Sequence, residues 1–274
     1  MKTTHRAIPI VVLALSSGCA AAPEAEEPSA KTSEALVSGD YDSIGDQVRL
    51  WHVSWGFCFL TGVAGNLQGV DPTFPTSTGG ELYVSGGYWW LGSSEVELHA
   101  RCVPWSSFSS AGTERIVSAP EGWSTRTPSL WNRTTLCYLS GVGNGFDDGN
   151  HAVEVRLPTR MFFDSDTWKL SSTTVDASAM CIDTRRTTEW KRTTHSWVQG
   201  RPQTWMMPTS AGACLLTGMS GKFGGVGERV EIAEDSGYWV LRGTSNQFGV
   251  SARAECVEWN QGTTLPTPPK PGPF

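Results

Sequence analysis

The segment Cys58-Phe-Leu-Thr-Gly-Val63 recurs twice along the chain, as Cys137-Tyr-Leu-Ser-Gly-Val142 and as Cys214-Leu-Leu-Thr-Gly-Met219. A motif that returns at a regular distance is the signature of an internal repeat, and each copy normally forms one structural unit. The chain of 274 residues is therefore expected to contain three homologous units.

Two further blocks recur in the same order. The first block is Gly87-Tyr-Trp-Trp-Leu91, Asp166-Thr-Trp-Lys-Leu170 and Gly237-Tyr-Trp-Val-Leu241. The second is Val96-Glu-Leu-His-Ala-Arg-Cys102, Val175-Asp-Ala-Ser-Ala-Met-Cys181 and Val250-Ser-Ala-Arg-Ala-Glu-Cys256. An aromatic pair upstream also recurs, as Tyr41 with Trp51, Trp123 with Trp131, and Trp197 with Trp205. We place repeat 1 at 38–106, repeat 2 at 120–185 and repeat 3 at 194–260, with residues 106–119 and 186–193 as polar connections.

The residues inside these blocks alternate with a period of two. In the block 96–102 every second residue is apolar or small, and most of the residues between them are polar or charged. This pattern is typical of a β-strand with one buried face, whereas no window shows a helical stripe. We therefore expect an all-β fold of three homologous antiparallel repeats, each with four or five strands. Tryptophans at non-equivalent positions favour repeats packed with pseudo-threefold symmetry, and tandem beads are the alternative.

Six of the seven cysteines belong to the repeats, with intervals of 44, 35, 44, 33 and 42 residues. Units of this size have marginal cores, so we expect the cysteines to form disulfides in an oxidising compartment. Pairing within repeats gives Cys58–Cys102, Cys137–Cys181 and Cys214–Cys256. The rival is a ring between repeats, Cys102–Cys137, Cys181–Cys214 and Cys256–Cys58. We favour the first pairing because its cysteines bracket the Trp-Leu strand of each repeat.

The N-terminal segment has the features of a secretory signal. Residues 1–18 contain Lys2 and Arg6, then the apolar run 7–15, which is too short to span a bilayer as a permanent helix. The small residues before Cys19 resemble the lipobox of bacterial lipoproteins, which implies a lipid on Cys19 that anchors the mature chain to the membrane. Ser16 stands where the family usually has Leu, and cleavage within residues 20–22 would instead give a periplasmic or secreted protein.

The segments that flank the repeats have no apolar periodicity. Residues 19–37 are expected to form a disordered tether, and residues 261–274 a Pro-rich extended tail. Because Ala20 is not Asp, the resemblance to lipoproteins favours the outer membrane. The pattern of the three blocks is also similar to modules of unknown function in bacterial secreted and lipid-anchored proteins, and this resemblance covers residues 38–260 and implies no catalytic residues.

The charge balance and the motifs exclude several functions. With 21 Lys and Arg against 27 Asp and Glu, the chain lacks the cationic excess of a nucleic-acid-binding protein. We find no catalytic motif and no histidine spacing typical of a metal site, and therefore expect no cofactor, no metal and no enzymatic activity. The segment 144–150 gathers oxygen-bearing side chains without the spacing of an EF-hand, so we interpret it as a tight turn.

Tryptophan is the remaining functional signal. The repeated Trp89, Trp168 and Trp239 share a face with a leucine and are expected in the core. The candidates for ligand binding are those without a full set of counterparts, namely Trp55, Trp90, Trp105, Trp190 and Trp259. Trp90 should point away from Trp89, onto the outer face of its strand. Exposed aromatic rings suit stacking on sugars or docking against a protein, and the competing interpretation is that these rings fill the seams between repeats.

We therefore expect a binding or recognition module of the cell envelope, with carbohydrate as the favoured ligand. An envelope scaffold that binds another protein is the alternative. A hydrolase is the third hypothesis, and it requires clustered carboxylates or a Ser-His pair in the folded chain.

Overall fold

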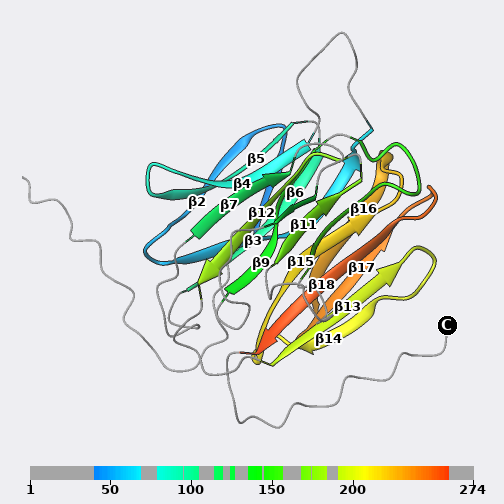
Figure 1. Cartoon of the computed structure of the whole chain (residues 1–274). Helices are drawn as coiled ribbons and strands as arrows, with labels where there is room; N and C mark the ends of the chain where they lie inside the picture. Colours follow the sequence, from blue (N-terminus) through cyan, green and yellow to red (C-terminus); the bar gives the residue numbers. More distant parts are fainter. Residues whose placement is uncertain are drawn as a thin grey trace, which may run out of the picture. The chain divides into compact units, whose positions relative to one another are not determined.

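The chain folds into β-strands throughout the part that the structure describes. The computed structural model describes residues 40–68, 79–94, 96–104, 114–119, 124–126, 135–143, 145–156, 168–173, 175–183 and 191–258. These residues form eighteen strands in three six-stranded antiparallel sheets (Figure 1), which confirms the all-β class. Within the same ranges, no helix has the length and apolar character needed to cross a lipid bilayer.

Each repeat supplies six strands. Repeat 1 contains β1 (Asp40–Ile44), β2 (Gln47–His52), β3 (Gly56–Asn66), β4 (Gly79–Ser85), β5 (Tyr88–Ser94) and β6 (Val96–Pro104). Repeat 2 contains β7 (Glu114–Ala119), β8 (Ser124–Arg126), β9 (Thr135–Val142), β10 (Ala152–Arg156), β11 (Lys169–Ser172) and β12 (Ala177–Asp183). Repeat 3 contains β13 (Arg192–Val198), β14 (Thr204–Pro208), β15 (Gly212–Ser220), β16 (Gly224–Asp235), β17 (Tyr238–Thr244) and β18 (Ser251–Glu258).

The structure differs from the sequence-based expectation in the strand count, which was four or five strands for each repeat, and at two boundaries. The first strand of each repeat is an edge strand, as is the second, so each has a partner on only one side. Edge strands need less apolar patterning than central ones, and the sequence signal here is correspondingly weak. Strand β7 lies in the stretch predicted as a polar connection, so repeat 2 begins before residue 120, and β13 begins two residues before the predicted boundary at 194.

The three sheets are built by exchange between repeats. Sheet I has the order β1-β6-β3-β16-β17-β14, sheet II β2-β5-β4-β9-β12-β7, and sheet III β13-β18-β15-β10-β11-β8. Each sheet therefore joins the cystine half of one repeat, made of its first, sixth and third strands, to the tryptophan half of another, made of its second, fifth and fourth. We call each junction a seam.

The seams close a ring. Sheet I joins repeats 1 and 3, sheet III joins repeats 3 and 2, and sheet II joins repeats 2 and 1. Tandem beads are excluded, because a bead would keep both halves of its repeat in its own sheets. Cyclic pairing of the sheets does not by itself require that a threefold rotation relates the repeats. The predicted pseudo-threefold symmetry therefore stays a prediction.

The disulfides pair within repeats, between residues that lie directly opposite on neighbouring strands. They are Cys58–Cys102, Cys137–Cys181 and Cys214–Cys256, with Cα–Cα distances of 4.0, 4.1 and 3.9 Å. The pairing is the one favoured from the spacing, but the reason given for it was wrong. The intervening Trp-Leu strand does not lie between the two cysteines in one sheet. It belongs to another sheet, so each cystine closes a chain loop that passes through two sheets.

The strand that contains the first recurring motif, from Cys58 to Val63 and its two counterparts, is buried on both faces. The sequence predicted a strand with one buried face. Strands β3, β9 and β15 each contact the other two, and their described residues from the motif are buried without alternation. The residue after the first cysteine shows this best, since Phe59, Tyr138 and Leu215 are all fully buried. The hydroxyl of Tyr138 also donates a hydrogen bond to the carbonyl oxygen of Cys58 in another repeat, at 2.8 Å.

The Thr or Ser of the motif makes a β-bulge. The register shifts between Leu60 and Gly62, leaving Thr61 without a cross-strand partner, and the same shift occurs at Ser140 and Thr217. After the bulge, the motif glycine lies opposite a glutamate on a strand of another repeat. An added Cβ on Gly62 would lie 3.1 Å from the Cβ of Glu231, and the motif glycine is therefore what lets the tryptophan half of repeat 3 approach.

The repeated tryptophans connect the two halves of their own repeat. Trp89, Trp168 and Trp239 are buried, which confirms their assignment to the core. The indole N–H of Trp89 donates to the carbonyl oxygen of Gly56 at 3.1 Å, and that of Trp239 donates to Gly212 at 2.9 Å. Each of these two hydrogen bonds joins a strand of one sheet to a strand of another and so links the two halves of the repeat.

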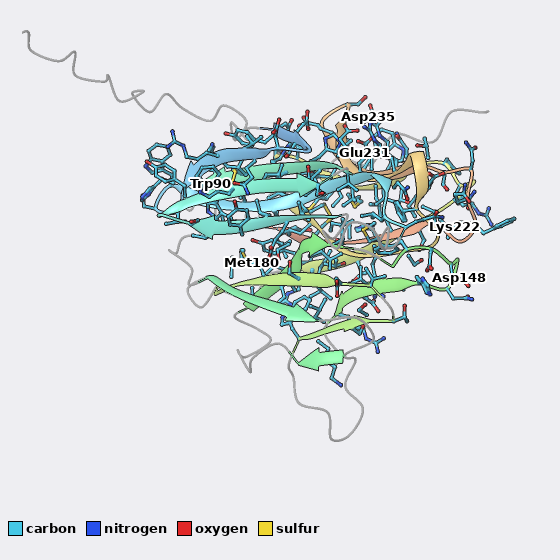
Figure 2. All side chains as sticks on the ribbon, turned by 90° about the horizontal axis from the view of Figure 1, so that it is seen from above. Trp90, Asp148, Met180, Lys222, Glu231 and Asp235 are labelled. Atoms are coloured by element: carbon cyan, nitrogen blue, oxygen red, sulfur yellow. A yellow bond between two sulfur atoms is a disulfide. The ribbon has the colours of Figure 1, made fainter. Side chains whose placement is uncertain are left out.

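Three residues, one from each repeat, are joined in a cycle by backbone hydrogen bonds. The N–H of Leu67 donates to the carbonyl oxygen of Phe223 at 2.8 Å, that of Phe223 to Phe146 at 2.8 Å, and that of Phe146 to Leu67 at 3.1 Å. All three side chains are fully buried, and the rings of Phe146 and Phe223 meet edge to face at 5.3 Å. Figure 2 shows Asp148 and Lys222, which are close to this ring in sequence, at the opposite end of the sheets from Trp90.

Tyr41 and Trp197, which the sequence paired as counterparts, are not equivalent in the structure, and Trp123 and Trp131 lie outside the described residues. Tyr41 lies opposite Ala100 and Trp197 lies opposite Ala252, which is two residues away from the equivalent of Ala100. His195 occupies the true counterpart of Tyr41. Similar spacing along the chain therefore suggested a correspondence that the strand registers do not support.

The closed ring predicts one cooperative unfolding transition. Phe146→Ala should lower the free energy of unfolding by about 3–5 kcal/mol, because it removes a buried ring from the point where the repeats meet. Phe248→Ala is the matched control, since this side chain is 85% exposed and its removal should change stability by no more than about 0.5 kcal/mol. Urea unfolding followed by fluorescence and circular dichroism measures both; separate transitions for the repeats would contradict the shared sheets.

Each cystine should stabilise the folded chain through the loop that it closes. Replacing Cys58 and Cys102 together by Ala should lower the free energy of unfolding by up to about 4 kcal/mol, because the sequence separation is 44 residues. Denaturant unfolding of the oxidised proteins gives this value. An unchanged midpoint would show that the bridge does not constrain the unfolded chain as proposed.

Candidate functional site

The outer face of sheet II carries a row of large side chains on the tryptophan half of repeat 1. Arg49 of β2 lies opposite Trp90 of β5, and Trp90 lies opposite Tyr83 of β4. Trp90 is partly exposed whereas its neighbour Trp89 is buried, so the prediction that Trp90 faces outward is confirmed. The row therefore presents two aromatic side chains and one guanidinium side by side.

The next row on the same face crosses the seam into repeat 2. It runs in register over five strands through Gln47, Gly92, Glu81, Gly141 and Ser178. One further row, two residues along each strand, contains Ser94, Gly79, Gly143 and Asp176. Most positions in these two rows have no side chain or only a hydroxymethyl group.

These small residues leave a groove of about 700 Å³ along the seam. Its described lining comes from both repeats and includes Gln47, Glu81, Tyr83, Asp176 and Ser178. The volume lies in the range of small-molecule sites, and the polar groups comprise carboxylate, amide, hydroxyl and phenol oxygens. The groove is thus a hollow in an otherwise continuous sheet face, with the row of Trp90 and Tyr83 beside it.

The other two seams show what fills the equivalent space. A glutamate opposite the motif glycine is common to all three seams: Glu81 faces Gly141, Glu231 faces Gly62 and Glu154 faces Gly218. The residues around this glutamate differ, and they decide whether a groove is open.

In sheet I the glutamate is held by arginines. Nε of Arg242, which occupies the position equivalent to Gly92, lies 2.7 Å from Oε1 of Glu231, and Nη1 of Arg229 lies 3.9 Å from Oε2. A cavity of about 430 Å³ remains there, and both arginines line it. The seam of sheet I is therefore an ion-paired surface.

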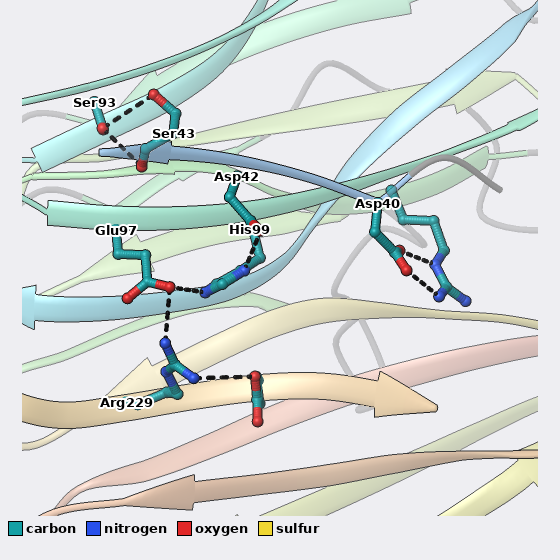
Figure 3. A network of polar contacts seen from close by, with 9 residues as sticks. Asp40, Asp42, Ser43, Ser93, Glu97, His99 and Arg229 are labelled. Atoms are coloured by element: carbon teal, nitrogen blue, oxygen red, sulfur yellow. Dashed lines mark hydrogen bonds and ion pairs between the residues drawn. The ribbon is translucent and has the colours of Figure 1, made fainter. Parts of the chain in front are cut away.

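The charge network extends across that seam to the edge strand β1. Nη2 of Arg229 lies 2.8 Å from Oε1 of Glu97, and His99 lies between Glu97 and Asp42, at 2.9 Å and 2.5 Å (Figure 3). Arg101 is buried beside these residues and donates to both carboxylate oxygens of Asp40, at 2.6 and 2.9 Å (Figure 3). The contact between Arg229 and Glu97 joins repeats 3 and 1, and the other ion pairs lie within repeat 1.

In sheet III the glutamate is also neutralised. Arg253 forms an ion pair with Glu154, and Nη1 of Arg156 lies 3.9 Å from the same carboxylate. The cavity there has about 200 Å³ and is lined by arginines, including Arg192. Burial raises the pKa of nearby Glu255, with Arg192 and Arg253 opposing the shift, and burial lowers the pKa of Arg192. Two of these charges are thus desolvated and partnered inside the fold.

The predicted binding aromatics are only partly brought together. Trp55 is 64% exposed in the turn between β2 and β3, where its ring lies 6.1 Å from that of His52, and it does not line the groove. Trp105, Trp190, Trp259 and the lipidation site Cys19 lie outside the described residues, as do the signal segment 1–18, the tether 19–37 and the tail 261–274. Trp90 is the predicted candidate that stands next to the groove.

Sequence reasoning missed Tyr83, Glu81 and the glycines of the groove. The signal that could have found them is a departure between aligned repeats: Gly92 corresponds to Arg242 and Ser171, and Ser178 to His99 and Arg253. Ser178 is small where both other copies carry a basic side chain, whereas Gly92 is small like Ser171 and differs only from Arg242.

Metal binding finds little support among the described ranges, where no group of three or more His, Cys, Asp and Glu side chains could hold an ion. In the segment interpreted as a tight turn, the side chain of Asp148 accepts a hydrogen bond from the backbone N–H of Asn150 at 3.1 Å. His151 contacts Asp147 at 2.6 Å in the same turn. Phe146 of this segment is the residue with a structural role, through the hydrogen-bonded ring.

Comparison with known proteins adds no assignment. No protein-family model matches the chain, and no curated protein matches it with significance. The groove and its neighbours therefore have to be interpreted from their own chemistry.

Gly92→Arg tests the origin of the groove. An added Cβ would lie 3.4 Å from Tyr83 and 3.5 Å from Gln47, which is ordinary contact, so the arginine should fold and pair with Glu81 as Arg242 pairs with Glu231. We expect a change of less than about 1 kcal/mol in the free energy of unfolding, as is usual for exposed ion pairs. Urea unfolding and a crystal structure of the variant measure this, with Arg242→Gly as the reciprocal control; loss of several kcal/mol would contradict the outward position of Gly92.

Proposed function

We propose that this protein is a non-enzymatic lipoprotein of the bacterial cell envelope that binds carbohydrate at the seam of sheet II. The lipid on Cys19 would anchor the chain to the outer membrane, and the tether 19–37 would hold the folded repeats clear of the surface. The observation that carries the proposal is the adjacency of the aromatic row, Trp90 and Tyr83, to the polar groove over Glu81.

The chemistry of this surface suits a sugar. A sugar ring has apolar faces of C–H groups and an edge of hydroxyls, so a site for it needs flat aromatic surface beside hydrogen-bonding groups. Trp90 and Tyr83 supply the aromatic surface, and Gln47, Glu81 and Ser178 supply acceptors and donors in the next row. Gly92 and Gly141 leave room for a ligand to reach the sheet.

The location is supported in part by the cystines. Three disulfides are consistent with an extracellular or periplasmic protein, because such bonds persist in oxidising compartments. The lipid anchor rests on the N-terminal sequence alone. The acidic charge of -6 supports the expectation that nucleic acid is not the ligand.

The folded chain also brings two carboxylates to the groove, which is the condition set for the hydrolase hypothesis. A glycosidase needs one of its carboxylic acids to stay protonated, and enzymes achieve this by burying it. Asp176 is exposed and Glu81 is only half-buried, so the groove favours binding over hydrolysis. Incubating each bound oligosaccharide with the protein and measuring its chain length decides this point; shortening of the chain would replace binding by hydrolysis as the function.

A glycan array followed by fluorescence titration tests the proposal. Trp90→Ala and Tyr83→Ala should each weaken binding of an array hit by about tenfold or more, the effect of losing a central aromatic contact. Lys169→Ala is the matched control, because Lys169 occupies the position of Trp90 in repeat 2 and should leave binding unchanged.

The outcomes are distinct. Loss of binding in both aromatic variants, with unchanged unfolding midpoints, supports the site. A hit whose affinity is the same in Trp90→Ala, Tyr83→Ala and the control would move the site elsewhere. Absence of any glycan hit, together with cross-linking to one dominant envelope protein, would favour the scaffold alternative.

A further inference from the structure

The glutamate of the open seam has lost the partners that its two counterparts retain. Glu231 contacts Arg242 and Arg229. Glu154 contacts Arg253 and Arg156. Among the described residues, Glu81 makes no side-chain hydrogen bond or ion pair. The backbone position is the same in all three seams, so the difference lies in the side chains around it.

The missing cations can be traced position by position. Gly92 replaces Arg242, Gly79 replaces Arg229, and Ser178 replaces Arg253. Tyr83 replaces Arg156, which changes a cation into an aromatic ring. Every position that supplies an arginine to the glutamate in another seam is thus glycine, serine or tyrosine in sheet II.

The described lining of the groove contains no Lys, Arg or His side chain. Glu81 and Asp176 are the two carboxylates of this lining, which therefore offers no basic side chain to pair with Glu81. The other two seam cavities are lined by two and three arginines. Arg49, in the aromatic row, is directed to a ring instead: its guanidinium lies over Tyr88 at 4.9 Å.

From these observations we infer that the groove takes a glycan carrying protonated amino groups, and that Glu81 is the residue that selects them. The inference rests on the proposed function, since it specifies the sugar class for the same groove. A ligand ammonium group takes the place of the guanidinium that neutralises Glu231 and Glu154, and makes a charge-assisted hydrogen bond with the carboxylate. The same charge disfavours glycans that carry carboxylate, sulfate or phosphate groups.

The spacing fits this arrangement. Glu81 and Tyr83 lie two residues apart on β4, so their Cα atoms are about 7 Å apart and their side chains share one face. A sugar ring stacked on Tyr83 or Trp90 therefore places the substituents at its edge over Glu81.

The experiment compares one oligosaccharide in three chemical forms. Calorimetric titrations use a β-1,4-linked glucosamine oligosaccharide, its fully N-acetylated counterpart, and an oligosaccharide of uronic acid, at a pH where the amines are protonated. We expect the amino form to bind about tenfold or more tightly than the acetylated form, and the acidic form to bind most weakly.

Variants assign the selectivity to Glu81. Glu81→Gln keeps the size of the side chain and removes its charge, so it should abolish the preference for the amino form while leaving binding of the acetylated form unchanged. Gly92→Arg should have the same effect on preference by supplying the arginine of repeat 3. The matched control is Glu234→Gln, which should leave the preference intact. Glu234 is an exposed carboxylate on β16 of sheet I, whereas the groove lies on sheet II.

The two proposals fail in different ways. Equal affinity for the amino and acetylated forms, or a preference that persists in Glu81→Gln, overturns the selection by Glu81 while the carbohydrate site stands. Tighter binding of the acidic form also overturns it. If none of the three forms binds and the glycan array is empty, the proposed function itself is wrong.

Discussion

Every feature of this fold depends on the close approach of strands from different repeats at the motif glycine. Gly62, Gly141 and Gly218 each follow a β-bulge and face a glutamate of another repeat, where a larger residue would press on the neighbouring strand. The hydrogen-bonded ladder therefore continues from one repeat into the next. Because each repeat gives its two halves to different sheets, no repeat has a complete sheet of its own.

The cystine, the indole and the ring of Leu67, Phe146 and Phe223 stabilise this exchange at different levels. The cystine holds two central strands of one half in register, and the indole N–H links that half to the other half across the fold. The three backbone hydrogen bonds then join all repeats at one end. Covalent bonds thus act within a repeat, whereas the contacts between repeats are made by backbone pairing and burial.

The candidate binding surface is open because one seam lacks the arginines that cover the other two. Three seams share one backbone arrangement, and two of them are covered by arginines that pair with the common glutamate. In the third seam the same positions are Gly92, Gly79 and Ser178, so both the space and the charge of Glu81 are left for a ligand. Repeated architecture allows this, because backbone pairing joins the repeats in all three seams, so the side chains of one seam can diverge while the arrangement of strands is kept.

The amino-acid sequence determined the all-β class, the number of repeats and the inward tryptophans, because each of these depends on local periodicity or on a motif that recurs. It favoured cysteine pairing within repeats but left pairing between repeats open, and the structure decided for the first. The sequence also indicated that Trp90 faces outward, since neighbouring residues of a strand point to opposite faces. The exchange of halves between sheets, the ring through Phe146 and the groove beside Glu81 were decided only by the tertiary structure. Each of them joins residues of different repeats, and the pairing of strands that are distant in sequence depends on three-dimensional packing that spacing along the chain does not encode.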